Sequence, residues 1–231
     1  MKIPGAWIGG AALVLGPVLL LADTLLRSPF HFFFPDQLRA AAEHPALMSA
    51  AYTAFLAGNV LMLPAVAFLA QRIAEHRPTW AVWGAALVAV GLFERTFHAG
   101  VDHAAFSATE HLGLEGATGL VAKGYGDLHL FSYLSFTIMF GWYVLAIAAY
   151  LGGELGKVRS VALATMGLLP LGVLKGTEVV SIVGTVGLCV ALVPLGVRVL
   201  AQQTRPTKRQ VLTAVPVAVG LGALAVLSTL G

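Results

Sequence analysis

The chain has 231 residues, of which 58% are hydrophobic and 11% are charged, and its mean hydropathy is +0.85. A soluble domain carries about 25% charged residues, so this composition excludes an ordinary soluble protein and predicts an all-α integral membrane protein. The formal net charge of +3 comes from Lys and Arg residues scattered between apolar runs, which reports membrane topology and not nucleic-acid binding. We expect a multi-pass protein of the cell membrane, in contact with the lipid bilayer and without a nucleic-acid partner.

Seven apolar runs approach the roughly 20 residues that a helix needs to cross about 30 Å of hydrocarbon. They cover residues 6–26, 47–72, 80–103, 128–151, 158–175, 178–200 and 211–230. Because these runs take up nearly the whole chain, residues 1–231 are predicted to form a single domain, a bundle of seven transmembrane helices.

Basic residues divide unequally between the two ends of these runs. Nine of the 14 Lys and Arg residues lie at the N-terminus and in the second, fourth and sixth connections: Lys2, Arg72, Arg77, Lys157, Arg159, Arg198, Arg205, Lys208 and Arg209. Basic residues concentrate on the cytoplasmic side of membrane proteins. The distribution therefore predicts a cytoplasmic N-terminus and an extracytoplasmic C-terminus.

The connections and the second run contain further local signals. Asp36 follows Pro35 and predicts a short surface helix that continues to about Glu43. Asn59, near the middle of the second run, needs a hydrogen-bond partner on a neighbouring helix. The third connection, residues 107–126, is rich in glycine, and a connection of this length without regular structure is often a lid or a binding loop.

The third run contains the densest group of ionisable residues, in the stretch LFERTFHAGVDH. An ionisable residue within a membrane span costs about 2.5 to 3.5 kcal/mol on insertion scales, so such residues have a partner or a function. Glu94, His98 and Asp102 are spaced four residues apart, which places them on one face of a helix, with Arg95 at the edge of that face.

Other polar residues are predicted to reach the same level of the membrane. With the topology above, nine of the eleven acidic residues and six of the seven histidines fall on the outer half or outside. His129 begins the fourth span, which short connections make antiparallel to the third. The residues predicted to support the site are Asp23, Asp127, His103, Lys175 and Glu178.

Carboxylate oxygens and imidazole nitrogens on facing helices suit zinc or another divalent metal. We predict His98, Asp102 and His129 as metal ligands and Glu94 and Arg95 as catalytic residues, with Glu94 as general base or as a residue that orients a ligand. The corresponding function is a metal-dependent membrane hydrolase or lyase that acts on a lipid or other apolar substrate from the outer leaflet.

The same residues leave other functions open. They can form ion pairs that only hold the bundle together, or they can serve a transporter or binding protein for a cation, a proton or a cationic ligand. His98 and His129 are the one pair that suits haem in a redox protein. Glu94 and Asp102 can also act as acids in a metal-free cyclase.

The seven-span plan, with a cytoplasmic N-terminus and intramembrane histidine and acid, is similar in outline to membrane hydrolases of the alkaline ceramidase and adiponectin receptor type. That resemblance implies zinc held among the helices. The sequence departs from those families in two ways: no H-x-x-x-H occurs in the last span, and the predicted site opens outward. A shared fold does not carry function by itself.

Overall fold

The computed structural model describes residues 5–124, 129–169, 175–203 and 208–228, and these residues are largely helical, with no strand among them. The chain divides into two compact units, Met1–Ala201 and Gln202–Gly231. The second unit contains α9 (Lys208–Leu227), a helix that covers most of the last predicted span. The fold and the candidate site below belong to the first unit.

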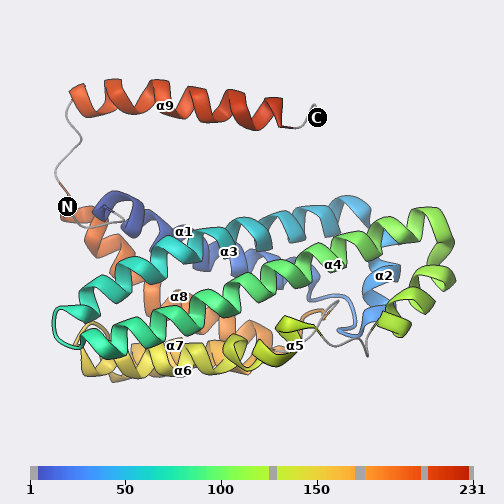
Figure 1. The fold of residues 1–231 in the computed structure, drawn as a ribbon, viewed down its shortest axis with the longest axis horizontal. Coiled ribbons are helices and arrows are strands. Elements are labelled where there is room, and N and C mark those ends of the chain that lie inside the picture. Colours follow the sequence, from blue (N-terminus) through green and yellow to red (C-terminus); the bar gives the residue numbers. More distant parts are fainter. Residues whose placement is uncertain (1–4, 125–128, 170–174, 204–207, 229–231) are drawn as a thin grey trace. The chain divides into compact units, whose positions relative to one another are not determined.

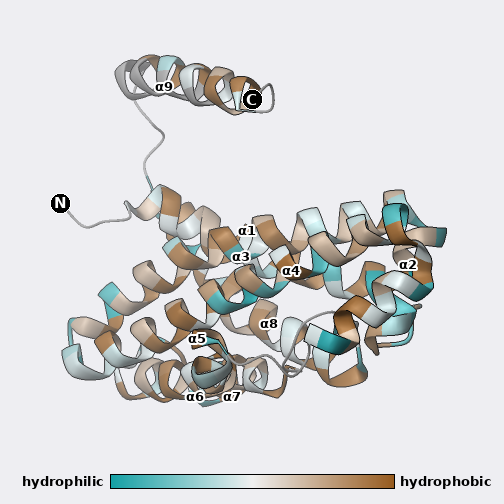
Figure 2. Ribbon diagram, turned by 45° about the vertical axis from the view of Figure 1, so that its right-hand side comes forward, coloured by the Kyte–Doolittle hydropathy of each residue, from teal (hydrophilic) through white to brown (hydrophobic). Residues whose placement is uncertain are grey.

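Five helices in the described residues are long and apolar enough to cross a membrane. They are α1 (Ala6–Arg27), α3 (Pro45–Ala74), α4 (Pro78–Gly124), the stretch Leu130–Leu151 that joins α5 (Leu130–Leu134) to α6 (Phe136–Leu151), and α8 (Val179–Ala201). Five of the seven predicted spans are thus confirmed as helical where the structure describes them, and the long apolar helices indicate a membrane-embedded, multi-pass protein. Figure 2 shows hydrophobic residues along most of these helices and hydrophilic residues gathered near α2.

The long helices lie side by side (Figure 1), with α1 packed against α3 and α8, and α4 packed against α3 and α6. Glycines let α4 and α6 approach closely. A Cβ atom added to Gly141 would lie 2.8 Å from the backbone nitrogen of Val88, and one added to Gly91 would lie 2.9 Å from the carbonyl oxygen of Thr137. Close approach through small residues is the usual way in which membrane helices pack.

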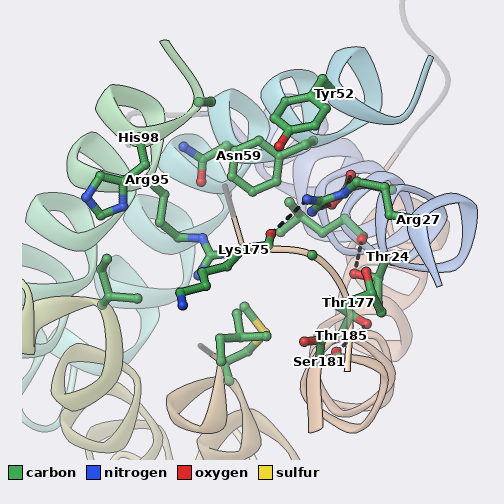
Figure 3. A pocket seen from close by; sticks show the side chains of 18 of the residues that line it. Thr24, Arg27, Tyr52, Asn59, Arg95, His98, Lys175, Thr177, Ser181 and Thr185 are labelled. Carbon is green, nitrogen blue, oxygen red and sulfur yellow. Dashed lines mark hydrogen bonds and ion pairs between the residues drawn. The ribbon is translucent and has the colours of Figure 1, made fainter. Parts of the chain in front are cut away.

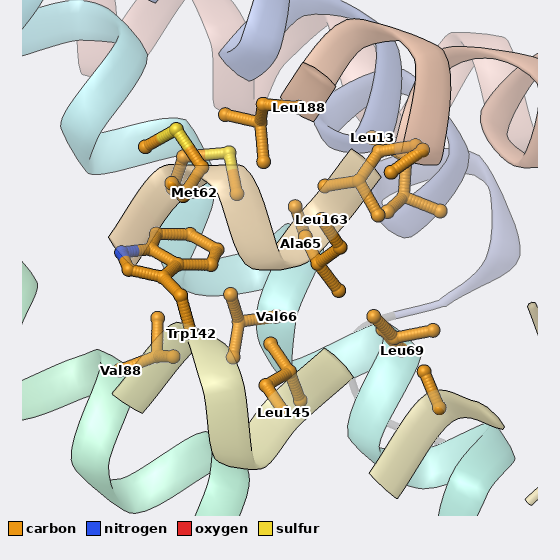
Figure 4. Close-up of a cluster of buried hydrophobic side chains, with 14 of the residues drawn as sticks. Leu13, Met62, Ala65, Val66, Leu69, Val88, Trp142, Leu145, Leu163 and Leu188 are labelled. Atoms are coloured by element: carbon orange, nitrogen blue, oxygen red, sulfur yellow. The ribbon is translucent and has the colours of Figure 1, made fainter. Parts of the chain in front are cut away.

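The main hydrophobic core fills the space between these helices (Figure 4). Its fully buried members come from α1, α3, α4, α6, α7 and α8, and they include Leu13, Met62, Leu69, Val88, Leu145, Leu163 and Leu188. This core joins α1 and α3, from the N-terminal part of the first unit, to α6, α7 and α8, from its C-terminal part. It therefore holds in place the helices that carry the polar residues of the candidate site.

The predicted lid or binding loop at 107–126 is wrong over its described part. Helix α4 continues to Gly124 and changes direction at Gly113, where φ is 70° and ψ is 169°. A positive φ is easily adopted by glycine, so the chain turns there and a second helical stretch follows. That stretch forms a small apolar cluster with α2 (Phe34–Glu43). Helix α2 confirms the short helix predicted after Pro35.

The fifth predicted span, 158–175, is also wrong as a single helix. Helix α7 (Lys157–Ala164) and the 3₁₀ turn η1 (Thr165–Leu168) have 8 and 4 residues, which make about 20 Å of helix. Leu169 is extended, with φ −65° and ψ 139°, because a residue that precedes proline is disfavoured in the helical region. Residues 170–174 of this predicted span lie outside the described residues.

Helix α7 runs antiparallel to α8 at the level of the spans. The Arg159 Nε atom donates a hydrogen bond of 2.9 Å to the carbonyl oxygen of Ala191. The Thr165 hydroxyl donates one of 3.4 Å to the carbonyl oxygen of Val183. The chain then continues without helix from Lys175 to Glu178, before α8 begins. The segment between α6 and α8 therefore contains a short helix with non-helical backbone at each end.

Candidate functional site

A pocket lies inside the first unit, between α1, α3, α4, α6, η1, α8 and the non-helical stretch 175–178. Its polar lining consists of Asp23, Thr24, Arg27, Tyr52, Asn59, Arg95, His98, Asp102, Lys175, Thr177, Ser181 and Thr185. Its apolar lining includes Leu20, Phe55, Leu92, Ala99, Ile138, Trp142, Met166 and Leu169. The cavity has a volume of about 60 Å³, which is enough for a few waters or a small solute.

Asp23 and Arg27 form a buried ion pair one helical turn apart in α1. The Nε and Nη2 atoms of Arg27 each donate a hydrogen bond of 2.7 Å to a different oxygen of Asp23. The exposed fractions are 2% for Asp23 and 7% for Arg27. The remaining Arg27 nitrogen, Nη1, donates to the carbonyl oxygen of Lys175 at 3.0 Å. This bond ties α1 to the stretch that precedes α8 (Figure 3).

Tyr52 connects this ion pair to α4. Its ring lies 5.0 Å from the Arg27 guanidinium carbon, within the range of a cation–π interaction. Its hydroxyl donates a hydrogen bond of 2.9 Å to the Asp102 Oδ2 atom. One side chain of α3 therefore contacts a cation of α1 and a carboxylate of α4.

Asn59 joins α3 to α4, as expected from its position near the middle of the second predicted span, where an amide needs a hydrogen-bond partner on a neighbouring helix. Its Nδ2 atom donates to the Leu92 carbonyl oxygen at 2.8 Å and to the Thr96 hydroxyl oxygen at 2.7 Å. The side chain is buried, yet its Oδ1 atom has no hydrogen-bond partner within the described parts of the chain. Buried polar atoms are generally hydrogen-bonded, so this oxygen is an unsatisfied acceptor in a residue that lines the pocket.

Arg95 extends from α4 toward the pocket (Figure 3), and its guanidinium carbon lies 5.4 Å from the centre of the Phe55 ring. It makes no hydrogen bond or ion pair with any residue that the structure describes. The Lys175 ammonium, which lies near the rings of Phe32 and Phe33, adds a further positive charge to the lining.

No protein family matches this chain, and neither does any curated protein or solved structure. Function must therefore be argued from the chemistry of the pocket and of the residues beside it. The outcome for each residue predicted from the sequence follows from the contacts above.

Glu94 lies outside the pocket, although its neighbour Arg95 lines it. The Glu94 side chain is fully buried, and its Oε1 atom accepts a hydrogen bond of 2.7 Å from the Ser135 hydroxyl. The His98 Nε2 atom lies 3.9 Å from the same oxygen. Glu94 thus contacts the α5–α6 junction, while His98 lies beside Glu94 and lines the pocket.

The three predicted metal ligands do not form one group. His98 and Asp102 line the pocket, but the Asp102 carboxylate contacts Tyr52 on α3. The His129 ring packs against Phe97, with 5.0 Å between ring centres. In the described ranges no three His, Cys, Asp or Glu side chains are placed to hold a metal ion. The metal site stays a prediction.

The predicted supporting residues have three different outcomes. Asp23 and Lys175 line the pocket, whereas His103 and Glu178 are exposed. Asp127 lies outside the described residues.

The sequence interpretation named Asp23 as a supporting residue, but it missed the partner of Asp23, Arg27, and the hydroxyl residues at the start of α8, although both carry a recognisable pattern. Asp23 and Arg27 have opposite charges at the four-residue spacing that favours a helical ion pair. Ser181 and Thr185 have the same spacing and place two hydroxyl groups on one face of α8, and Thr177 adds a third hydroxyl from the non-helical stretch before it. Tyr52 has no such signal, because its role depends on contacts with two other helices.

Proposed function

We propose that this chain is a membrane transport protein that takes a small polar solute into the pocket between its spans. The proposal rests on one observation: the buried Asp23–Arg27 pair and the buried Asp102 surround one cavity at the level of the spans. Ionisable side chains inside a membrane are costly and usually mark the path of a solute or ion. Their arrangement around a cavity favours a binding role over a purely structural one.

The interrupted segment between α6 and α8 supports transport. Non-helical backbone at membrane depth is tolerated where it is buried in protein or lines a cavity. Leu169, just after η1, and the stretch 175–177 contribute to the pocket lining. Transporters commonly place such discontinuous helices at their binding sites, where the break lets one part of a helix move relative to the other.

We also propose seven membrane crossings, with the segment of α7 and η1 as the fifth and α9 as the seventh. The distribution of Lys and Arg residues supports a cytoplasmic N-terminus and an extracytoplasmic C-terminus. With this orientation, Asp23 and Arg27 lie near the outer end of α1, so the pocket belongs to the outer half of the membrane.

Cysteine labelling tests access to the pocket without knowledge of the solute. Cys189 is the one cysteine of the sequence, so Cys189→Ser provides a cysteine-free background. Ser181→Cys in that background places a thiol on the pocket wall. We expect it to react with a membrane-impermeant methanethiosulfonate applied to reconstituted vesicles from the outside and, more slowly, from the inside.

Two further positions serve as controls. Leu188→Cys, in the apolar core, should not react, and Ser28→Cys, at the exposed end of α1, should react from the outside alone. A Ser181→Cys protein that is folded but unreactive would contradict an accessible pocket. Reaction from the outside alone would contradict transport and leave a binding protein.

The metal-dependent enzyme remains a second proposal, because His98 and Asp102 line the same pocket and His98 lies 3.9 Å from Glu94. A hydrolase or lyase would admit a lipid or other apolar substrate there. Elemental analysis and a visible spectrum of the purified protein test zinc, iron and haem together. A stoichiometric metal that is lost in His98→Ala/Asp102→Ala would favour the enzyme over the transporter.

A further inference from the structure

We infer that the solute is a small organic carboxylate and that Arg95 binds its carboxylate group. This inference rests on the proposed transport function, whose solute it specifies. It differs from the cation or cationic ligand that the acidic residues of the sequence suggest.

The partners of the two carboxylates in the pocket favour an anion over a cation as the solute. The lining contains three cationic side chains, Arg27, Arg95 and Lys175, and two carboxylates, Asp23 and Asp102. Asp23 is engaged by Arg27 through two hydrogen bonds, and Asp102 accepts a hydrogen bond from Tyr52. A cation entering the pocket would therefore meet carboxylates that already have partners.

Arg95 is the cation best placed to receive the anion. It has no ion-pair partner within the described ranges, in contrast to Arg27. Its guanidinium carbon lies 5.4 Å from the centre of the Phe55 ring, within the range of a cation–π interaction. A guanidinium presents parallel N–H donors that match the two oxygens of a carboxylate.

The remaining walls favour an organic ion over an inorganic one. Ile138, Trp142, Met166 and Leu169 provide an apolar surface within the same pocket. A cavity of about 60 Å³ suits a solute with a few carbon atoms.

The charge preference of the pocket is measured with Ser181→Cys in the Cys189→Ser background. The rates at which the thiol reacts with anionic sulfonatoethyl and cationic trimethylammonioethyl methanethiosulfonate are compared. The ratio of these two rates is divided by the same ratio at the exposed Ser28→Cys, which removes the difference in intrinsic reactivity between the reagents. We expect the anionic reagent to be favoured at least about tenfold at Ser181→Cys, since a hydrogen bond to a charged group changes affinity by that factor or more. Arg95→Gln should remove the preference, whereas Arg39→Gln, at an exposed site, should leave it unchanged.

Protection by a carboxylate provides a second measurement. We expect propionate to slow labelling of Ser181→Cys and the uncharged propionamide to have little effect at the same concentration. Arg95→Gln should raise the propionate concentration needed for protection at least about tenfold, and Arg95→Lys should raise it less. If Arg95→Gln does not fold, Arg95→Lys and the comparison of propionate with propionamide decide the question.

The possible outcomes separate this inference from the proposed function. Absence of labelling at Ser181→Cys contradicts the accessible pocket itself. Labelling without an anion preference, equal protection by propionamide, or an unchanged preference in a folded Arg95→Gln protein leaves the pocket intact and overturns the assignment of a carboxylate to Arg95. Chloride protecting as well as propionate overturns the organic class.

Discussion

Arg27 and Lys175 lie 148 residues apart in the sequence and are joined by a hydrogen bond of 3.0 Å from the Arg27 Nη1 atom to the Lys175 carbonyl oxygen. The same guanidinium holds Asp23 through its other nitrogens. Backbone outside a helix needs partners for its carbonyl groups at membrane depth, and Arg27 supplies one. The ion pair in α1 therefore helps to position the non-helical stretch before α8, which lines the pocket.

The Asp23–Arg27 pair should contribute strongly to stability. Asp23→Asn leaves the buried Arg27 cation without its counter-charge, and we expect the free energy of unfolding to fall by about 3 to 5 kcal/mol. Unfolding titrations in mixed micelles measure this change. Asp36→Asn is the matched control, because Asp36 pairs with Arg39 at an exposed site and should lose about 1 kcal/mol or less. Equal losses in the two variants would show that the buried pair has no special role.

The Tyr52 hydroxyl should stabilise the protein through Asp102. Tyr52→Phe keeps the ring beside Arg27 but removes the donor to the buried carboxylate, so we expect a loss of about 1 to 3 kcal/mol in the free energy of unfolding. The comparison is Tyr133→Phe, at a residue that is 68% exposed, which should change stability little. A neutral effect of Tyr52→Phe would mean that another donor satisfies Asp102 in its place.

Close contact between α4 and α6 should depend on Gly141. Gly141→Ala places a Cβ atom 2.8 Å from the Val88 backbone nitrogen, so the two helices must separate. We expect a loss of about 1 to 3 kcal/mol, the usual range for overpacking, measured by the same titrations. Gly100→Ala adds the same methyl group to α4 where nothing lies within 4 Å, and it should be neutral or stabilising. Similar behaviour of the two variants would contradict the tight helix contact.

The change of direction in α4 should depend on the backbone of Gly113. Gly113→Ala forces an L-residue into a backbone conformation that is essentially confined to glycine, which costs about 1 to 3 kcal/mol, and should loosen the stretch 114–124 from α2. Limited proteolysis should cut this stretch faster in the variant. Gly119→Ala, within the same stretch and with open space around it, should slow cleavage by favouring helix. Unchanged cleavage in Gly113→Ala would indicate that this stretch does not depend on the turn.

The sequence by itself determined the class of the protein and most of its helices. Runs of about 20 apolar residues can satisfy their backbone in a membrane as helices, so five spans were predicted where the structure has long apolar helices. The concentration of ionisable residues in the third span also identified α4 as a wall of the site. These features are local, because each depends on composition or spacing within one segment.

Tertiary structure decided how the polar residues combine. The four-residue spacing of Glu94, His98 and Asp102 suggested one common face, but His98 and Asp102 line the pocket while Glu94 contacts Ser135. A helical face spans a wide angle, so its two edges meet different neighbouring helices, and spacing along one chain segment does not specify those neighbours. Contacts such as Arg27 with Lys175 and Tyr52 with Asp102 depend on how distant segments pack, and only the folded chain brings them together.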